Sequence, residues 1–484
     1  MLRRRTVASL CLAVILAAIS QTAITQTRPA AIPDTAPGRL LKAWIESFNA
    51  GDLDGRTKFL SEHVSDAARQ MPPAQAAERD LRFRSRIGGG FDVFKIEDSS
   101  STELRAILKE KGGFGWAELR LKVDPAKPGL IAAIDLHPVP PPTETRAGRE
   151  GQDALIKDVS QMLEKLAAED RFSGVVLVAK DGKPLFEKAY GYADREKKIA
   201  NTMDTKFCIG SMNKMFTSVA IAQLVQLGKL SYSDTLAKLL PDYPDKDVAA
   251  KITLHQLLTH TSGLGDFFGP DFEQKKDSVR ELRDYLQFVA GKPLKFEPGT
   301  GWAYSNAGMI VAGLIVERIS GQNYFDYVQD HIYQPAGMAS SGSYEKNKPQ
   351  PHQAVGYMRQ DGKWVSNYAT LPLMGSSAGG GYSTAPDLLR FAEALREHKL
   401  LNTELTGVIT TGKVDVAFGG KYAYGFSESI VDGKRVVGHN GGAPGVNANL
   451  DIYWDSGYTV AVLANLDPPI AENVNAFIRD RIQP

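Results

Sequence analysis

Apolar residues occupy almost every face of the stretch from Ser211 to Leu227 when it is drawn as a helix. They fall all round its circumference, at Met212, Met215, Val219, Ala222, Leu224, Val225 and Leu227. A helix that is apolar nearly all round is a buried one. Gly228 follows, and glycine suits the left-handed residue that ends a helix. The pattern therefore predicts a buried helix over 211–227.

Residues 34–138 change from helical to strand periodicity along their length. Helices are expected over 40–48, 54–64 and 74–84, and strands over 91–97, 103–110, 117–123 and 130–136. Helices followed by an antiparallel sheet indicate a small α+β domain. The order resembles the cone-shaped nuclear transport factor 2-like fold. That resemblance implies either an accessory role or a ligand in the cone, and we favour the accessory role.

A Pro-rich, polar linker over 139–150 separates this domain from a second one over 151–484. The second domain is predicted to contain a helix over 154–168, a hairpin over 174–190, and strands over 424–431, 435–439, 447–453 and 458–464, with a closing helix over 471–482. The fold class is α+β. One antiparallel sheet flanked by helices, with a helical lobe beside it, accommodates these elements.

The first 23 residues have the pattern of a secretory signal peptide. Arg3–Arg5 precede an apolar run over 7–19, which is short for a membrane span, and small residues suited to cleavage follow. We expect a periplasmic or secreted protein without a membrane span once the leader is removed; an uncleaved anchor is the alternative. Removal would leave Cys208 as the only cysteine, so no intramolecular disulfide is expected.

Composition excludes some classes of partner. The chain has 484 residues, of which 43% are hydrophobic and 23% charged, as in ordinary soluble globular proteins. Its net charge of +1 becomes −2 without Arg3–Arg5. Neither value indicates a nucleic acid or an anionic membrane surface as partner.

Ser211 and Lys214 stand three residues apart at the start of the buried helix, hence on one face. The positive end of the helix dipole favours an anionic hydroxyl, and burial lowers the pKa of a lysine towards that of a working base. The pair is interpreted as nucleophile and activator; the alternative is a helix cap followed by a surface lysine. A second copy, Ser343 to Lys346, lies in a polar loop without an apolar helix behind it.

Two further motifs are candidates for the same site. Tyr304 can act as a base if Lys214 lowers its pKa, and Asn306 can position Lys214 and a substrate amide. His439 is expected to end a strand and open a glycine turn over 440–442, in which the Gly442 amide would pair with that of Ser211 to hold an oxyanion. The alternatives are a core tyrosine that caps a helix and a satisfied histidine at a strand end.

Together, Ser211-x-x-Lys214, Tyr304-x-Asn306 and His439-x-Gly441 resemble the three active-site motifs of serine β-lactamases and penicillin-binding-protein relatives. The likeness covers about 151–484 and is closest to the class C β-lactamase, D-alanyl-D-alanine carboxypeptidase and esterase branch. The stretches 257–264, 335–338 and 379–384 agree with it. Class C β-lactamases carry Lys-Thr-Gly where this chain has His-Asn-Gly, so efficient β-lactam hydrolysis is not expected.

Competing motifs are weaker. Gly375-Ser376-Ser377-Ala378-Gly379 fits the nucleophile elbow of α/β-hydrolases but lacks the strand before it and the helix after it. His255 and His260 are five residues apart, off a common helical face, and no pattern completes a metal site. No metal and no cofactor are predicted.

The sequence therefore predicts a secreted serine hydrolase that cleaves an ester, an amide or a D-amino-acid peptide through a Ser211 acyl-enzyme. Lys214 and Tyr304 would manage the proton, while Asn306, His439, Gly441 and Gly442 would bind substrate and oxyanion. The expected partner is a small-molecule or peptide substrate. The alternative is a binding or assembly module of the same fold with little turnover.

Overall fold

The structure is a computed structural model that describes residues 30–69, 71–113, 115–139, 141–142, 145, 151–360, 362–416, 420–431 and 433–482. The predicted signal peptide and most of the predicted linker lie outside these residues. Within them, none of the helices combines the length and apolarity needed to cross a bilayer.

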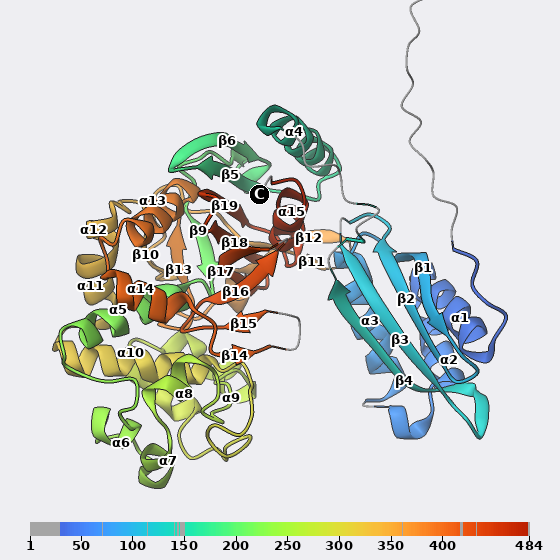
Figure 1. Cartoon of the computed structure of the whole chain (residues 1–484), viewed down its shortest axis with the longest axis horizontal. Helices are drawn as coiled ribbons and strands as arrows, with labels where there is room; N and C mark the ends of the chain where they lie inside the picture. The colour runs from blue at the N-terminus through green and yellow to red at the C-terminus, as the bar shows by residue number, and fades with distance from the viewer. Residues whose placement is uncertain are drawn as a thin grey trace, which may run out of the picture.

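The N-terminal region is an antiparallel sheet with helices packed on it (Figure 1). Its elements are α1 (Ala36–Ala50), α2 (Leu53–His63), a 3₁₀ turn (Asp66–Ala68), α3 (Pro73–Arg86), β1 (Phe91–Ser99), β2 (Glu103–Glu110), β3 (Trp116–Asp124) and β4 (Lys127–Val139). The strands pair in chain order. These helices and strands match the sequence predictions; the nuclear transport factor 2-like resemblance stays a prediction.

An eight-stranded antiparallel sheet organises the rest of the chain, in the order β14-β15-β16-β17-β18-β19-β5-β6. The strands are β5 (Gly174–Lys180), β6 (Lys183–Tyr190), β14 (Val414–Asp415), β15 (Lys421–Tyr422), β16 (Ser427–Val431), β17 (Lys434–Ala443), β18 (Val446–Tyr453) and β19 (Tyr458–Ala464). The N-terminal hairpin therefore joins the C-terminal strands in one sheet, as predicted, with β14 and β15 added at the edge.

Helices cover both faces of this sheet (Figure 1). On one face lie α4 (Gln152–Ala168) and α15 (Ile470–Arg479), which share an apolar core with residues such as Val176 and Val462. On the other lie α5 (Asn213–Gln226), α13 (Ala385–Arg396) and α14 (Thr403–Thr410), within a larger core that includes Val175 and Leu463. Neighbouring residues of one strand belong to different cores because side chains alternate across a sheet.

In sequence, a helical lobe follows the β5–β6 hairpin and precedes the C-terminal strands. Its helices are α6 (Leu236–Leu239), α7 (Lys246–Lys251), α8 (Leu254–Leu258), α9 (Pro270–Lys275), α10 (Asn306–Ser320), α11 (Tyr324–Val328) and α12 (Gln334–Ala336), with short 3₁₀ or π turns over 276–278, 282–288, 329–333 and 367–370. The shorter strands form small sheets of their own: β7 (Tyr192–Asp194) with β8 (Ile199–Ala200), β9 (Phe207–Gly210) with β13 (Gly381–Ser383) and β10 (Gly342–Ser343), and β11 (Tyr357–Gln360) with β12 (Lys363–Ser366).

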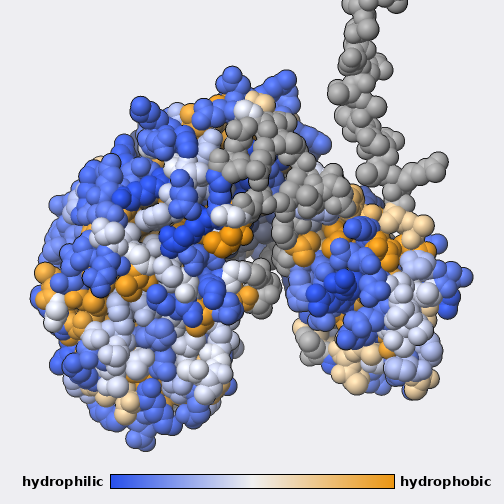
Figure 2. Space-filling view, in the orientation of Figure 1, coloured by the Kyte–Doolittle hydropathy of each residue, from blue (hydrophilic) through white to orange (hydrophobic). Residues whose placement is uncertain are grey.

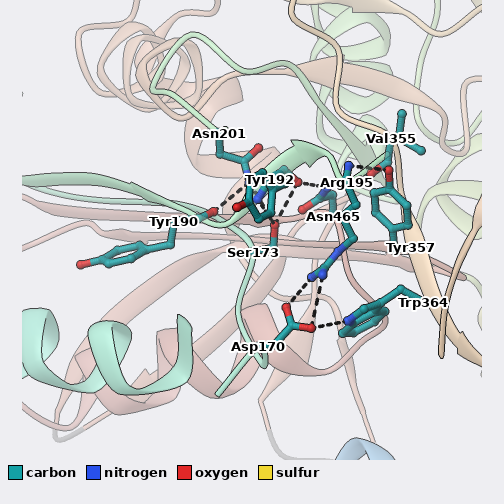
Figure 3. A network of polar contacts seen from close by, with 10 residues as sticks. All are labelled: Asp170, Ser173, Tyr190, Tyr192, Arg195, Asn201, Val355, Tyr357, Trp364 and Asn465. Carbon is teal, nitrogen blue, oxygen red and sulfur yellow. Dashed lines mark hydrogen bonds and ion pairs between the residues drawn. The ribbon is translucent and has the colours of Figure 1, made fainter. Parts of the chain in front are cut away.

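A polar network ties the β11–β12 hairpin to the large sheet (Figure 3). Asp170, just after α4, pairs with Arg195 and accepts a hydrogen bond from the Trp364 indole. The Asn465 side chain donates to the carbonyls of Tyr192 at 2.9 Å and Val355 at 2.8 Å. These bonds link segments far apart in sequence. On the face in Figure 2, apolar residues form scattered patches, as on ordinary protein surfaces.

Among the boundaries that differ from the sequence predictions, two lie at the candidate site. Helix α5 begins at Asn213, so Ser211 lies in the turn before it, and the Lys214 amide donates to the Ser211 carbonyl at 3.0 Å. Strand β17 continues to Ala443, so the prediction that His439 ends the strand and that 440–442 form a turn is wrong. The turn comes at Pro444-Gly445, because Gly441 and Gly442 pair with Ala448 and Asn447 of β18.

Candidate active site

Ser211 sits in the turn between β9 and α5, where it faces the first turn of that helix. The Lys214 amine, Nζ, lies 3.1 Å from Ser211 Oγ. Helix α5 is buried on nearly all sides, as its sequence predicts, and Lys214 itself has no exposed surface. The hydroxyl and the amine are therefore in direct contact, as the predicted nucleophile and base require.

Three oxygens surround the Lys214 amine. Besides Ser211 Oγ, they are Asn306 Oδ1 at 2.8 Å and the Ala378 carbonyl at 2.6 Å. The ring of Tyr304 lies 4.7 Å from Nζ. Burial lowers the pKa of Lys214 to about 7, and the charge of Asp266 partly opposes that shift. A substantial fraction of Lys214 is therefore neutral near pH 7, as the sequence predicted.

The segment 376–378 fixes the start of α5 through its backbone. Asn213 Nδ2 donates to the Ser376 carbonyl at 3.0 Å, and Thr217 Oγ1 donates to the Ser377 carbonyl at 2.7 Å. With the Lys214 bond to Ala378, three consecutive carbonyls are bound by one helix. The sequence analysis missed this role, because a backbone carbonyl can accept a hydrogen bond whatever the residue type.

Ser377, the serine of the rejected nucleophile elbow, is fully buried and donates to the Met309 carbonyl at 2.8 Å. Its hydroxyl is thus a buried structural group held by a backbone hydrogen bond.

Tyr304 lies beside Ser211 with a buried phenol. Burial raises its pKa above the ordinary value, and a hydrogen bond with Ser211 opposes this only in part. The expectation that Lys214 lowers the Tyr304 pKa is therefore wrong in this unliganded structure. The Asp266 charge adds to the effect of burial, and Lys214, with a pKa of about 7, is already neutral at the higher pH where a phenol ionises.

Asn306 opens α10 and bridges Lys214 to a carboxylate that sequence reasoning missed. Its Oδ1 faces Lys214, while its Nδ2 donates to Asp266 Oδ2 at 2.8 Å. Asp266 lies in the loop after α8, three residues beyond Gly263. A single acidic loop residue carries no pattern that would have marked it.

His439 has both ring nitrogens engaged within the protein. Nδ1 donates to the Asn440 carbonyl, so Nε2 is the acceptor for the Tyr422 hydroxyl, 3.0 Å away. Burial, together with the nearby Lys214, lowers the pKa of His439 to about 3. The imidazole is therefore neutral at working pH, with no polar atom left for a substrate.

The strand carrying His439 passes directly against the Ser211 turn. A Cβ built on Gly441 would lie 2.0 Å from the Ile209 carbonyl oxygen and 3.1 Å from the Ser211 amide. Strand β16 pairs with β17 only as far as Gly438. Among the described residues, the side of β17 that faces away from β18 has no partner strand from His439 to Ala443. A cavity of about 560 Å³ opens beside this edge and is lined in part by Tyr304, Tyr422 and His439.

The remaining candidate residues have other partners. Lys346 binds Asp277 at 2.8 Å rather than Ser343, so the second Ser-x-x-Lys is no catalytic pair. His255 contacts the Tyr424 hydroxyl, and His260 accepts from the Ser305 amide at 3.2 Å. Nor do the described residues bring three or more His, Cys, Asp or Glu side chains together as metal ligands.

Comparison with known proteins identifies the family of this fold and site. The β-lactamase family model matches residues 159–483. This chain belongs to the β-lactamase family. A β-lactamase-family relative, the putative penicillin-binding protein PbpX of Bacillus subtilis, is 32% identical over 309 residues, which cover 63% of this chain and 73% of that protein.

Solved structures agree with this assignment. A penicillin-binding protein from Bacillus halodurans is 34% identical, with a TM-score of 0.60, over 68% of this chain and 99% of that one. A D-stereospecific amidohydrolase from Streptomyces sp. shares the fold at 24% identity and a TM-score of 0.56, over 66% of this chain and 97% of that one. The resemblance inferred from the three motifs is thus confirmed: this β-lactamase-family chain is similar to penicillin-binding-protein-like serine hydrolases.

Proposed function

We propose that this protein hydrolyses esters or amides through an acyl-enzyme on Ser211. One observation carries the proposal: the way the hydrogens and the lone pair of the Lys214 amine match its three neighbouring groups. A neutral amine has two hydrogens and one lone pair. Asn306 Oδ1 and the Ala378 carbonyl can only accept, so they take the two hydrogens. The lone pair is left for the hydroxyl hydrogen of Ser211.

Acylation follows from this arrangement. Ser211 Oγ attacks the substrate carbonyl carbon as its proton moves to Lys214 Nζ. The carbonyl oxygen becomes an oxyanion, which the backbone amides of Ser211 and Gly442 would hold at the free edge of β17. When the tetrahedral intermediate collapses, the leaving group takes a proton. The neutral phenol of Tyr304, between Ser211 and Lys214, would relay it from Lys214.

Deacylation reverses these roles. A water molecule attacks the acyl carbon, and its proton passes through the phenol of Tyr304 to Lys214. The bond from the acyl carbon to Ser211 Oγ then breaks, and the same proton returns to Ser211 Oγ. Asn306 would hold Lys214 in place throughout and offer its second amide hydrogen to a substrate acceptor.

The site favours neutral substrates. The third-motif residue is a neutral histidine with both nitrogens occupied, so it gives no charge-assisted hydrogen bond to a carboxylate beside the scissile bond. Simple esters and D-amino-acid amides fit better than β-lactam antibiotics. The amidohydrolase named above acts D-stereospecifically, which makes D-amino-acid amides part of the first panel to test.

The competing function is a binding module that acylates once without turnover. A panel of p-nitrophenyl esters, D-alanyl peptides and a chromogenic cephalosporin, run with wild-type and Ser211→Ala protein, separates the two. Sustained Ser211-dependent release over many equivalents supports the enzyme. A single-equivalent burst followed by no further release would support the binding module.

We also propose that the enzyme works outside the cytoplasm, on the basis of the charged and apolar pattern of residues 1–23. N-terminal sequencing of protein recovered from a secretion-competent bacterial host tests this. A mature start near residue 20 supports it, and an intact Met1 on cell-retained protein contradicts it.

A further inference from the structure

Asp266 is linked to Ser211 only through Asn306 and Lys214, yet its carboxylate is hydrogen-bonded on both sides. Oδ2 accepts from Asn306 Nδ2 at 2.8 Å. Oδ1 accepts from the backbone amides of Phe267 at 2.7 Å and Phe268 at 3.4 Å. The carboxylate is half-buried and its direction is fixed by its own loop.

An asparagine amide can present either its oxygen or its nitrogen, and the two orientations fill the same space. A carboxylate can only accept, so Asp266 requires the nitrogen of Asn306 to point towards it. The oxygen of Asn306 must then face Lys214. In the flipped orientation an N–H would point at Lys214 and compete with Ser211 for the lone pair of the amine.

We propose that Asp266 is a positioning residue, which fixes the Asn306 amide so that the free lone pair of Lys214 is directed at Ser211. This rests on the proposed function of Ser211 and Lys214 and deepens it. Asp266 also adds a negative charge near the amine. The other titratable groups that face Lys214 are Tyr304, His260 and His439; burial keeps the phenol protonated and both imidazoles neutral, so none of them carries a charge.

Two variants separate the geometric from the electrostatic effect. Asp266→Asn removes the charge and leaves one acceptor oxygen, which can accept from Asn306 only if it gives up the backbone amides of Phe267 and Phe268, whereas Asp266→Ala removes the charge and both acceptors. Asp271→Asn is the matched control, because Asp271 is exposed at the start of α9 and carries the same charge. Thermal unfolding of each variant establishes that it is folded.

The first readout needs no activity: the pKa of Lys214, followed through the ¹³Cε shift in lysine-labelled protein and assigned with Lys214→Arg. Asp266→Asn should lower it by on the order of half a unit to one unit, since a nearby opposite charge favours the ammonium form. Asp271→Asn should leave it unchanged. An unchanged or raised Lys214 pKa in Asp266→Asn overturns the electrostatic half of the proposal.

The second readout is the rate at which a fluorophosphonate labels Ser211. On the plateau above pH 8, Asp266→Ala should label at least about tenfold more slowly than wild type. A plateau rate for Asp266→Ala equal to that of wild type overturns the positioning role. A wild-type protein that does not label at Ser211 refutes the proposed function instead, and the lysine titration still decides the effect of Asp266.

Discussion

The Tyr422 hydroxyl donates to Nε2 of His439 across 3.0 Å, and with Nδ1 bound to the Asn440 carbonyl this bond engages the last free nitrogen of the imidazole. In family members with Lys-Thr-Gly the corresponding residue is a cation. Here the position holds a buried neutral ring tied to a neighbouring strand. The difference bears directly on which substrates the site accepts.

We expect ester turnover to exceed cephalosporin turnover by orders of magnitude, and His439→Lys to narrow that gap. A charge-assisted hydrogen bond is worth roughly 1.5–3 kcal/mol, or about one to two powers of ten in kcat/KM. Tyr422→Phe is the control: it frees Nε2, but as an acceptor it still offers nothing to a carboxylate. Steady-state kinetics with both substrates decide this. Equal wild-type rates at pH 8 would show that His439 does not limit β-lactam hydrolysis.

The pH dependence of Ser211 labelling should follow Lys214 alone. Burial sets the Lys214 pKa at about 7, and only the neutral amine accepts a proton. The labelling rate should therefore rise with pH through about 7 and level off above it. His439, with a pKa of about 3, adds no step between pH 5 and 9. A rate that falls as pH rises through 7 would mean that the ammonium form is the active one.

Lys214→Arg should reduce the labelling rate by roughly 10²–10⁴, because a guanidinium stays charged and cannot serve as base. Stopped-flow or gel-based labelling measures it. The control is Lys346→Arg, which changes the lysine of the second Ser-x-x-Lys motif. It should label like wild type, since Lys346 pairs with Asp277 and not with Ser211. Comparable labelling by Lys214→Arg and wild type would remove Lys214 from the mechanism.

Gly441→Ala should slow labelling by about 100-fold or more while leaving a folded protein. The added methyl would meet the Ile209 carbonyl at 2.0 Å and force β17 away from the Ser211 turn, which separates the two oxyanion amides. Gly407→Ala is the matched control, because nothing lies within 4 Å of its position in α14. Wild-type labelling by Gly441→Ala would show that the close approach of β17 is not needed.

A protein comprising residues 146–484 should fold and hydrolyse an activated ester at a rate comparable with the full chain. The apolar core of the N-terminal region and the two cores of the larger region share no residues. We propose that residues 34–138 are an accessory domain on this basis. A soluble, folded truncation without activity would mean that the N-terminal region completes the site.

The sequence predicted the large sheet because its strands and turns follow strong local patterns, such as β19, which matches its predicted range of 458–464. Ser211, Lys214, Tyr304 and Asn306 were found because each lies in a short motif at the start of a helix, where spacing alone brings side chains together.

The rest of the site depends on long-range pairing. The turn after β17 was misplaced because glycines at 441 and 442 suggest a turn, whereas both lie in the strand and Gly441 permits its close approach to Ile209. Asp266, Tyr422 and the Ala378 carbonyl reach the site from separate loops and strands, so no local pattern marks them. The Tyr304 pKa was misjudged because burial, which raises it, is a property of the folded protein.

The most direct test of the account is the site of covalent labelling by a fluorophosphonate, located by peptide mass spectrometry. The label should lie on Ser211, vanish in Ser211→Ala, and persist in Ser343→Ala and Ser377→Ala. Ser343 has no lysine partner, and Ser377 is buried against Met309. A label on Ser343 or Ser377, or one that survives in Ser211→Ala, would contradict the assignment of Ser211 as the nucleophile.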